Sequence, residues 1–196
     1  MVKIPDIGSI ALHESDNNII FVGKMSYEPN IVAVTFFSTQ IFPSLKVQCP
    51  DLNFIIVGAN PDDRVKELSK IEGVIVTGFV DSVEPYFKNS TIVVAPMLTG
   101  AGIQNKIIQA MSQGCCVATT TIGAEGLEIN NEEIEILNSA EEWISGLSLL
   151  LKDRKLRIDK GRLARQYVID NLSPRIISRQ FWDFIRYGGI DVYESK

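Results

Sequence analysis

A glycine loop followed by a lysine carries the residue types best suited to hold an anion. The loop is Gly100-Ala101-Gly102, which follows the apolar run Ile92–Ala95 and leads into a segment with helical spacing that contains Lys106. Glycines at the start of a helix let an anion approach free backbone N–H groups at the positive end of the helix dipole. The pattern therefore predicts a phosphate site formed by this loop, by the N–H groups of Ile103 and Gln104, and by Lys106.

Two further loops place similar chemistry after other apolar runs. Gly23-Lys24 follows the run Ile19–Val22, and Gly123-Ala124-Glu125-Gly126 follows Val117–Thr119. Ligands of open parallel sheets bind outside the carboxyl ends of the strands, so we expect these loops to lie at one edge of a sheet. The alternative is that the glycines only make tight strand-to-helix turns and that the lysines are solvated, because short glycine motifs are often false positives.

The elements that would position these loops alternate along the chain. Short apolar runs without strict alternation are separated by segments with helical periodicity, which is typical of parallel βαβ units covered on both faces. We therefore predict an α/β fold, a Rossmann-like three-layer α/β/α arrangement with a six-stranded, mainly parallel sheet. The expected strands are Ile19–Val22, Phe54–Val57, Val74–Val76, Ile92–Ala95, Val117–Thr119 and Ile134–Leu137.

Helix boundaries are predicted from capping residues and prolines. Asn30 is expected to cap a helix that Pro43 ends, and Pro61 is expected at the first position of the next helix. Ser173 and Pro174 are expected to open the last helix. Capping-box patterns are found at Asp81 with Glu84 and at Ser139 with Glu142.

Three segments are expected along the 196 residues. Residues 1–18 lack periodicity and are interpreted as a connector, residues 19–187 as one domain, and residues 188–196 as a tail. A chain of this length that is 45% hydrophobic can bury a sizeable core. The last helix places Ile177, Phe181 and Phe184 on one face.

Composition excludes several function classes. The net charge of −5 argues against a general nucleic-acid-binding role. The sequence has neither an apolar run long enough to span a membrane nor a signal peptide, and its cysteines, Cys49, Cys115 and Cys116, are expected to be free thiols. We expect a cytoplasmic protein, whose full-length form could lie at the inner face of a membrane. No paired His or Asp-x-Asp suggests a metal, so neither metal nor cofactor is expected.

Four segments in order resemble a known family. The segments are Phe21–Asn30, Ile56–Pro61, Val76–Asp81 and Pro96–Leu127, the last of which ends in Gly123-Ala124-Glu125-Gly126-Leu127. They resemble the C-terminal, donor-binding half of GT-B glycosyltransferases, in the retaining, family-four-like group called glycosyl transferases group 1. The resemblance covers residues 19–186 and implies that a nucleotide-diphosphate sugar is the donor substrate.

The resemblance assigns roles to single residues. Gln109 takes the place of a family glutamate that binds the ribose, and Ala101 that of a glutamate near the transferred sugar. Phe79 and Val80 lie in the loop that reads the base, Val80 through its backbone, with a core position as the alternative for Phe79. The other positions that the resemblance places at the donor are Gly23, Lys24, Gly58, Gly100, Gly102, Ile103, Gln104, Lys106 and Glu125.

The function implied by the resemblance is sugar transfer to a glycan or lipid-linked acceptor in bacterial polysaccharide synthesis. Lys24 and Lys106 would stabilise the leaving diphosphate. The family's first domain, which holds the acceptor, is expected to be missing from this chain or supplied by another chain, so the chain alone is expected to be inactive. The loss of both glutamates leaves a non-catalytic nucleotide-sugar-binding module as an alternative. The second alternative is that the chain is half of a sugar-nucleotide epimerase.

Overall fold

A parallel six-stranded sheet forms the centre of the protein. The computed structural model describes residues 17–100 and 102–187. The strand order is β3-β2-β1-β4-β5-β6 and every pairing is parallel. The predicted Rossmann-like sheet is thus confirmed. The strands are β1 (Asn18–Val22), β2 (Asn53–Val57), β3 (Val74–Gly78), β4 (Ile92–Ala95), β5 (Val117–Thr119) and β6 (Glu135–Ile136).

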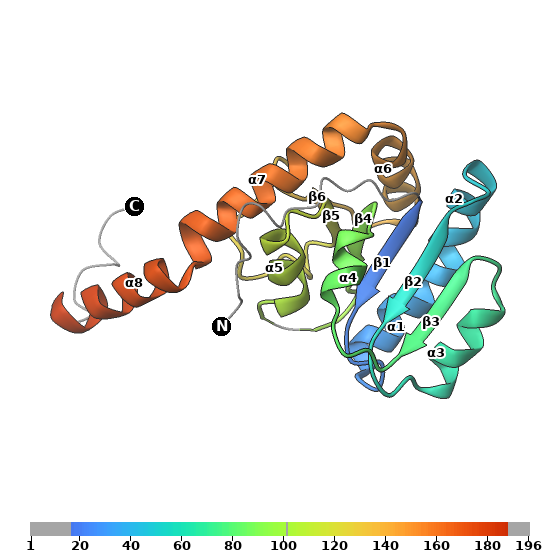
Figure 1. The fold of residues 1–196 in the computed structure, drawn as a ribbon, viewed down its shortest axis with the longest axis horizontal. Helices are drawn as coiled ribbons and strands as arrows, with labels where there is room; N and C mark the ends of the chain where they lie inside the picture. Colours follow the sequence, from blue (N-terminus) through green and yellow to red (C-terminus); the bar gives the residue numbers. More distant parts are fainter. Residues whose placement is uncertain (1–16, 101, 188–196) are drawn as a thin grey trace.

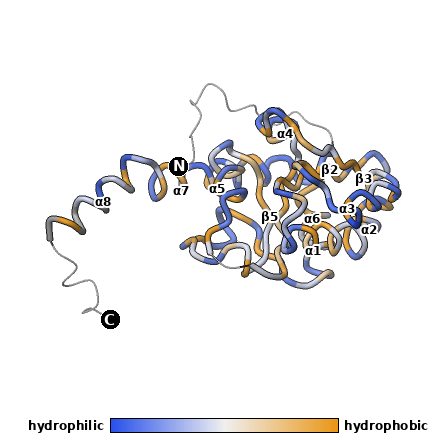
Figure 2. Tube along the Cα trace, turned by 90° about the horizontal axis from the view of Figure 1, so that it is seen from below, coloured by the Kyte–Doolittle hydropathy of each residue, from blue (hydrophilic) through white to orange (hydrophobic). Residues whose placement is uncertain are grey.

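Helices cover both faces of this sheet (Figures 1 and 2). Helices α1 and α2 lie on one face, while α4 and α5 lie on the other. The helices are α1 (Glu28–Phe36), α2 (Phe42–Gln48), α3 (Asp63–Glu67), α4 (Glu84–Lys88), α5 (Asn105–Ser112), α6 (Ala140–Lys152), α7 (Arg154–Leu172) and α8 (Pro174–Tyr187).

Burial explains why the apolar runs form strands. All four residues of β4 and all three of β5 are buried, as expected for strands that are covered on both faces. An aromatic cluster joins the sheet to the helices on the α1 face. The ring centroid of Phe37 lies 4.5 Å from that of Phe54 and 5.8 Å from that of Trp143. This core anchors the α1 side of the sheet.

Two predicted helix boundaries on this face are wrong. Asn30 is not a cap but the third residue of α1, where its buried side chain donates to the Lys24 carbonyl oxygen at 3.0 Å. Pro43 does not end a helix. After a π-helical turn (Phe37–Ile41) the chain continues into α2, and Pro43 lies in its first turn, where a missing N–H costs nothing.

Two further boundaries differ for the same kind of reason. Asp62 rather than Asn60 or Pro61 begins α3, because its carboxylate accepts the Arg64 N–H. Asp81 is not the cap of α4: the N-cap is Val83, and the Ser82 hydroxyl accepts the Glu84 N–H at 3.1 Å. In both places a side chain other than the predicted one accepts the hydrogen bond from the free backbone N–H. The Ser139 capping box and the start of the last helix at Pro174 are confirmed.

The chain leaves the sheet through its last two helices. Helix α7 packs against α5 and α6, and α8 continues from it away from the sheet (Figure 1). Trp182 and Ile185 of α8 are 56% and 54% exposed. The side chains of Ile177, Phe181 and Phe184 lie outside the described part, as do residues 1–16 and 188–196. The sheet begins at Asn18.

The order of the strands creates a switch point between β1 and β4. From β1 the chain moves outward through β2 and β3, and it then returns to β4 on the other side of β1. The loops after β1 and β4 therefore leave the sheet side by side and turn to opposite faces. In doubly wound sheets such a switch point is where ligands bind.

Ion pairs and backbone contacts fix the loop after β1 against the loop after β2. The Arg64 guanidinium donates to both carboxylate oxygens of Glu28, at 2.9 and 2.7 Å, and to Asp62 at 3.0 Å. These hydrogen bonds lower the pKa of both carboxyls. The Met25 N–H donates to Ala59 O at 3.0 Å, and the Asp62 N–H donates to Met25 O at 3.0 Å. The two loops thus behave as one unit.

The backbones of the two loops lie very close together at Gly58. A Cβ at Gly58 would lie 1.7 Å from the Gly23 carbonyl oxygen, whereas a Cβ at Gly78 would meet nothing within 4 Å. We expect Gly58→Ala to lower the free energy of unfolding by more than about 2 kcal/mol, because two backbones must separate. Gly78→Ala should cost about 1 kcal/mol, for its left-handed backbone alone. Urea unfolding of both variants measures this, and equal small losses would contradict the packing described.

Candidate functional site

Lys106 lies at the switch point, on the first turn of α5. Its Nζ donates to Oδ1 of Asn30 and lies 3.5 Å from Sδ of Met97. The same ammonium lies 4.7 Å from the centre of the Phe21 ring. These three neighbours come from β1, α1 and the loop after β4. The sequence-predicted cation is therefore enclosed by neutral side chains.

The charge of Lys106 is poorly compensated. Burial lowers its pKa to about 8. Among the ion pairs within the described residues, none involves Lys106. Lys106 is half-buried, and a partly buried ammonium without a carboxylate is costly, so an anionic ligand would reduce that cost. The site is therefore arranged to receive negative charge.

The backbone of Lys24 is linked to Lys106 through the side chain of Asn30. The Asn30 side chain joins the two predicted cations, since its Oδ1 accepts from Lys106 while its Nδ2 donates to Lys24 O at 3.0 Å. The Lys24 side chain is exposed. Gly23 and Gly58 are half-buried beneath it. The structure thus brings together the loops that the sequence assigned to the diphosphate.

The glycine loop after β4 differs from its prediction. Helix α5 begins at Asn105, with Gln104 as its N-cap, so Ile103 is not on the helix and is 50% exposed. The loop is two residues longer than the helical spacing suggests, and Gly100 and Gly102 in it have positive φ values of 126° and 75°. The Gln104 amide donates to Gly102 O at 3.2 Å. Ala101 lies outside the described residues.

Glu125 contacts the amide that was predicted for a phosphate. The Gly102 N–H donates to Oε2 of Glu125 at 3.2 Å, and Glu125 is exposed. The loops after β4 and β5 are thereby linked across the edge of the sheet. A diphosphate that uses this amide must first displace the carboxylate.

Three more residues that were predicted to bind the donor lie on α5 and in the loop after β3. Gln109 is half-buried and follows Lys106 by one helical turn, so both lie on one side of α5. Phe79 directly follows β3 and is 74% exposed, which makes the core alternative for it wrong. Val80 is half-buried. An exposed aromatic ring at the carboxyl end of a strand suits contact with a planar base.

Sequence reasoning missed the neutral neighbours of Lys106. Asn30 was interpreted as a helix cap, and Phe21 and Met97 were given no role at the site. The structure shows why Asn30 has another role, because it is buried inside the helix and a buried amide needs partners. Its partners come from segments 6 and 76 residues away along the chain.

Two absences apply to residues 17–100 and 102–187. No group of three His, Cys, Asp or Glu side chains is placed there to hold a metal ion. Nor does that part of the chain contain a helix with the length and apolar character needed to cross a membrane. The cysteines Cys49, Cys115 and Cys116 are free, and burial raises the pKa of Cys115 and Cys116 to about 12.

The cost of burying Lys106 predicts a pH effect on stability. The folded-state pKa of about 8 lies below the ordinary value near 10.5, so the unfolded chain binds more protons between these pH values. Stability of the parent should therefore rise with pH across that window. Lys106→Met has no ammonium at this position. Its free energy of unfolding should therefore exceed the parent's, and the excess should be largest below about pH 8. Urea unfolding at several pH values tests this. A difference between variant and parent that does not change with pH would contradict it.

Comparison with known proteins identifies the family. Residues 16–153 match the model of the family described as glycosyl transferases group 1. A curated relative, an uncharacterized 44.6 kDa protein in the cps region of Klebsiella pneumoniae, is 26% identical over 130 residues. That alignment covers 62% of this chain and 34% of the relative, so the chain spans about a third of that protein's length.

Solved structures share the fold. HepE of Anabaena, in complex with UDP and glucose, superposes with a TM-score of 0.71 at 15% identity, covering 88% of this chain and 48% of HepE. The C-terminal domain of the group 1 glycosyl transferase LpcC from Francisella tularensis gives a TM-score of 0.67 at 18% identity, covering 87% and 95%. With the family match over more than half its length, the chain belongs to the glycosyl transferases group 1 family and has the fold of a GT-B C-terminal domain.

Proposed function

We propose that this chain binds the nucleotide-diphosphate sugar of a glycosyltransferase, with the diphosphate at Lys106. The observation that carries the proposal is a half-buried ammonium at the switch point of the sheet, whose contacts among the described residues are all with neutral groups. A diphosphate supplies the missing negative charge. Gln109 would contact the ribose and Phe79 the base, in line with their places beside Lys106 and after β3.

The same arrangement supports a role in the chemical step. When the bond between the sugar and the diphosphate breaks, its electron pair stays on the leaving oxygen, and negative charge grows there. Lys106, Lys24 and the amides of the glycine loop would stabilise that charge more strongly than the ground state, which accelerates transfer. The acceptor oxygen forms the new bond to the sugar, and its proton passes to the leaving diphosphate oxygen. Retention of the anomeric configuration is part of this proposal, from the family resemblance.

The setting follows from the chain's relatives. HepE in complex with UDP and glucose supports a UDP-sugar as the donor. A relative in the cps region supports a part in polysaccharide synthesis. We propose that an acceptor-binding domain or chain completes the site, that the chain alone transfers nothing, and that the protein is cytoplasmic. Gln109, in place of the family glutamate, keeps a binding module without transfer as the second candidate.

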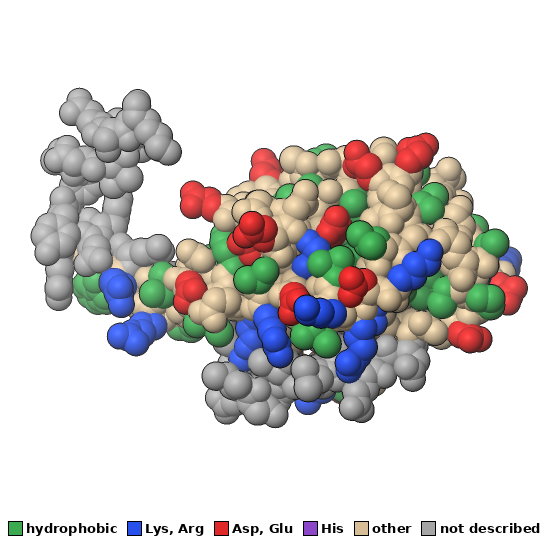
Figure 3. All heavy atoms as spheres, turned by 90° about the horizontal axis from the view of Figure 1, so that it is seen from above, with side chains coloured by type: hydrophobic (Ala, Val, Ile, Leu, Met, Phe, Trp, Pro, Cys, Tyr) green, Lys and Arg blue, Asp and Glu red, His purple; other side chains and the backbone are tan. Residues whose placement is uncertain are grey.

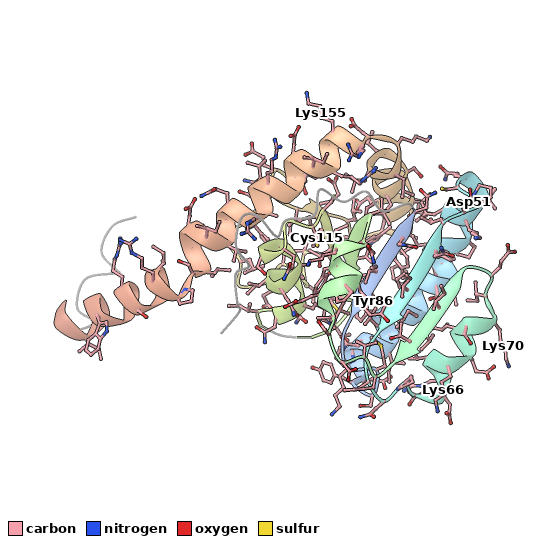
Figure 4. The ribbon with its side chains drawn as sticks, in the orientation of Figure 1. Asp51, Lys66, Lys70, Tyr86, Cys115 and Lys155 are labelled. Carbon is pink, nitrogen blue, oxygen red and sulfur yellow. The ribbon has the colours of Figure 1, made fainter. Side chains whose placement is uncertain are left out.

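Nucleotide binding tests the proposal. The chain should bind UDP with a dissociation constant between about 1 μM and 1 mM, because one open face leaves the ligand half solvated. Lys106→Ala should weaken binding more than tenfold, about 1.4 kcal/mol. Lys70→Ala is the matched control, since Lys70 ends the 3-10 turn that follows α3 and forms an ion pair with Glu67 at the surface (Figure 4). Equal affinities of both variants in calorimetry would refute the assignment.

Glu125 allows a second prediction at the same edge. Its carboxylate holds the Gly102 amide and adds negative charge beside the proposed diphosphate. Glu125→Gln should therefore raise the affinity for UDP by about threefold, as for one partly screened charge. If Glu125 also accepts bonds from the donor's sugar hydroxyls, the gain for a UDP-sugar should be smaller than for UDP. Weaker UDP binding by Glu125→Gln would show that the carboxylate does not compete with the phosphate.

A further inference from the structure

We propose that Asn30 is a positioning residue, which holds the ammonium of Lys106 charged and directed at the donor diphosphate while it fixes the loop that carries Lys24. This inference rests on the function proposed above. It assigns a role to a residue that the sequence pattern places only inside a helix. Asn30 itself is buried beneath the loop, so we infer that it acts through the two lysines.

The contacts of the Asn30 side chain support this role. It is only 3% exposed, and both ends of its amide are used. Its Oδ1 accepts from Lys106 Nζ, and its Nδ2 donates to the Lys24 carbonyl oxygen at 3.0 Å. One rigid side chain thus joins the first turn of α5 to the loop after β1, the two segments that meet at the switch point.

Gly23 shows how tightly this side chain is held. A Cβ at Gly23 would lie 2.7 Å from Nδ2 of Asn30, and it would also meet the Phe21 ring at 3.1 Å. The amide therefore packs against the loop backbone with no room for a side chain there. The position of Lys106 follows the position of this loop, because Asn30 contacts both.

The neutrality of the amide matters as much as its position. An amide oxygen accepts one hydrogen bond from the ammonium without cancelling its charge. A carboxylate in the same place would form an ion pair and leave little charge for a phosphate. It would also repel the Lys24 carbonyl oxygen, which the Asn30 Nδ2 now contacts. Asparagine is thus suited to hold a lysine that must bind an anion supplied by the ligand.

The pH dependence of binding reports on this arrangement. The groups that face Lys106 are Phe21 from β1, Asn30 from α1 and Met97 after β4, none of which titrates. The ionisable groups assigned to the same edge are Lys24 and Glu125. Burial lowers the pKa of Lys106 to about 8, so UDP affinity of the parent should fall as the pH rises above about 8.

The experiment measures UDP affinity by calorimetry across this pH range for the full 196-residue chain and its variants. Asn30→Asp tests charge at nearly constant size, and Asn30→Ala tests the contact. Each is combined with Lys106→Ala in a double-mutant cycle. Asn18→Asp is the matched control, because Asn18 Oδ1 accepts from Asn53 at 3.3 Å and its Nδ2 donates to Asn89 O at 3.4 Å. Asn18 is the first residue of β1, at the end of the strand opposite the proposed site. The face of the molecule seen in Figure 3 carries side chains of both charges.

We expect Asn30→Asp to weaken UDP binding more than tenfold at neutral pH and to remove the fall in affinity above about pH 8, because the ion pair keeps Lys106 protonated. Asn18→Asp should leave affinity within about twofold of the parent and keep the fall. In the Lys106→Ala background, Asn30→Ala should weaken binding clearly less than it does in the parent, since the part of its effect that acts through the Lys106 ammonium is already lost.

The outcomes separate this inference from the proposed function. If the parent binds UDP and Lys106→Ala loses it, while both Asn30 variants bind like the parent, the positioning role is refuted and the function stands. Additive losses in the double-mutant cycle also refute it, because Asn30 then acts apart from Lys106. A parent that does not bind UDP overturns both. Should Asn30→Ala fail to fold, the affinity and pH profile of Asn30→Asp decide alone.

Discussion

The uncompensated charge of Lys106 is the constraint on which the rest of the site depends. A buried ammonium favours its neutral form, and here burial lowers its pKa to about 8. The chain nevertheless surrounds it with an amide, a thioether and an aromatic ring rather than a carboxylate. Such an arrangement costs stability in the free protein. It is explained if a ligand brings the opposite charge.

The fold supplies the rigidity that this arrangement needs. Parallel strands bring the loops after β1 and β4 together at the switch point, and close backbone contact at Gly58 holds the loop after β1 in place. Arg64 ties the starts of α1 and α3 at the surface. On the other side, α7 packs so closely on α5 that a Cβ at Gly161 would lie 2.2 Å from the Gly114 carbonyl oxygen. Lys106 is therefore carried by an element fixed at both ends.

Much of the fold could be predicted from the sequence, because buried parallel strands leave a plain signal. Runs such as Ile92–Ala95 are apolar on both faces, and all six expected strands are found, with ends that differ by no more than two residues. Helix starts were less predictable. Asn30 and Asp81 look like caps, but which polar side chain reaches a free amide depends on local geometry that spacing alone does not contain.

The candidate site was predictable in its loops and not in its contacts. Glycines and lysines after strands pointed to one edge, and the topology places them there. The neutral cage around Lys106 joins residues far apart in sequence, so no local pattern predicts it. The bond between Gly102 and Glu125 likewise links two loops whose approach depends on the pairing of β4 with β5. These contacts depend on the tertiary fold, which is why the spacing of residues along the chain does not contain them.

A crystal structure of the chain with UDP tests the central claim most directly. The account predicts a phosphate oxygen within hydrogen-bond distance of Lys106 Nζ, with the ammonium still on Asn30 and the Glu125 carboxylate displaced from the Gly102 amide. A diphosphate bound elsewhere, with Lys106 contacting only Asn30, Met97 and Phe21, would contradict it. The buried charge would then belong to the core and not to a ligand site.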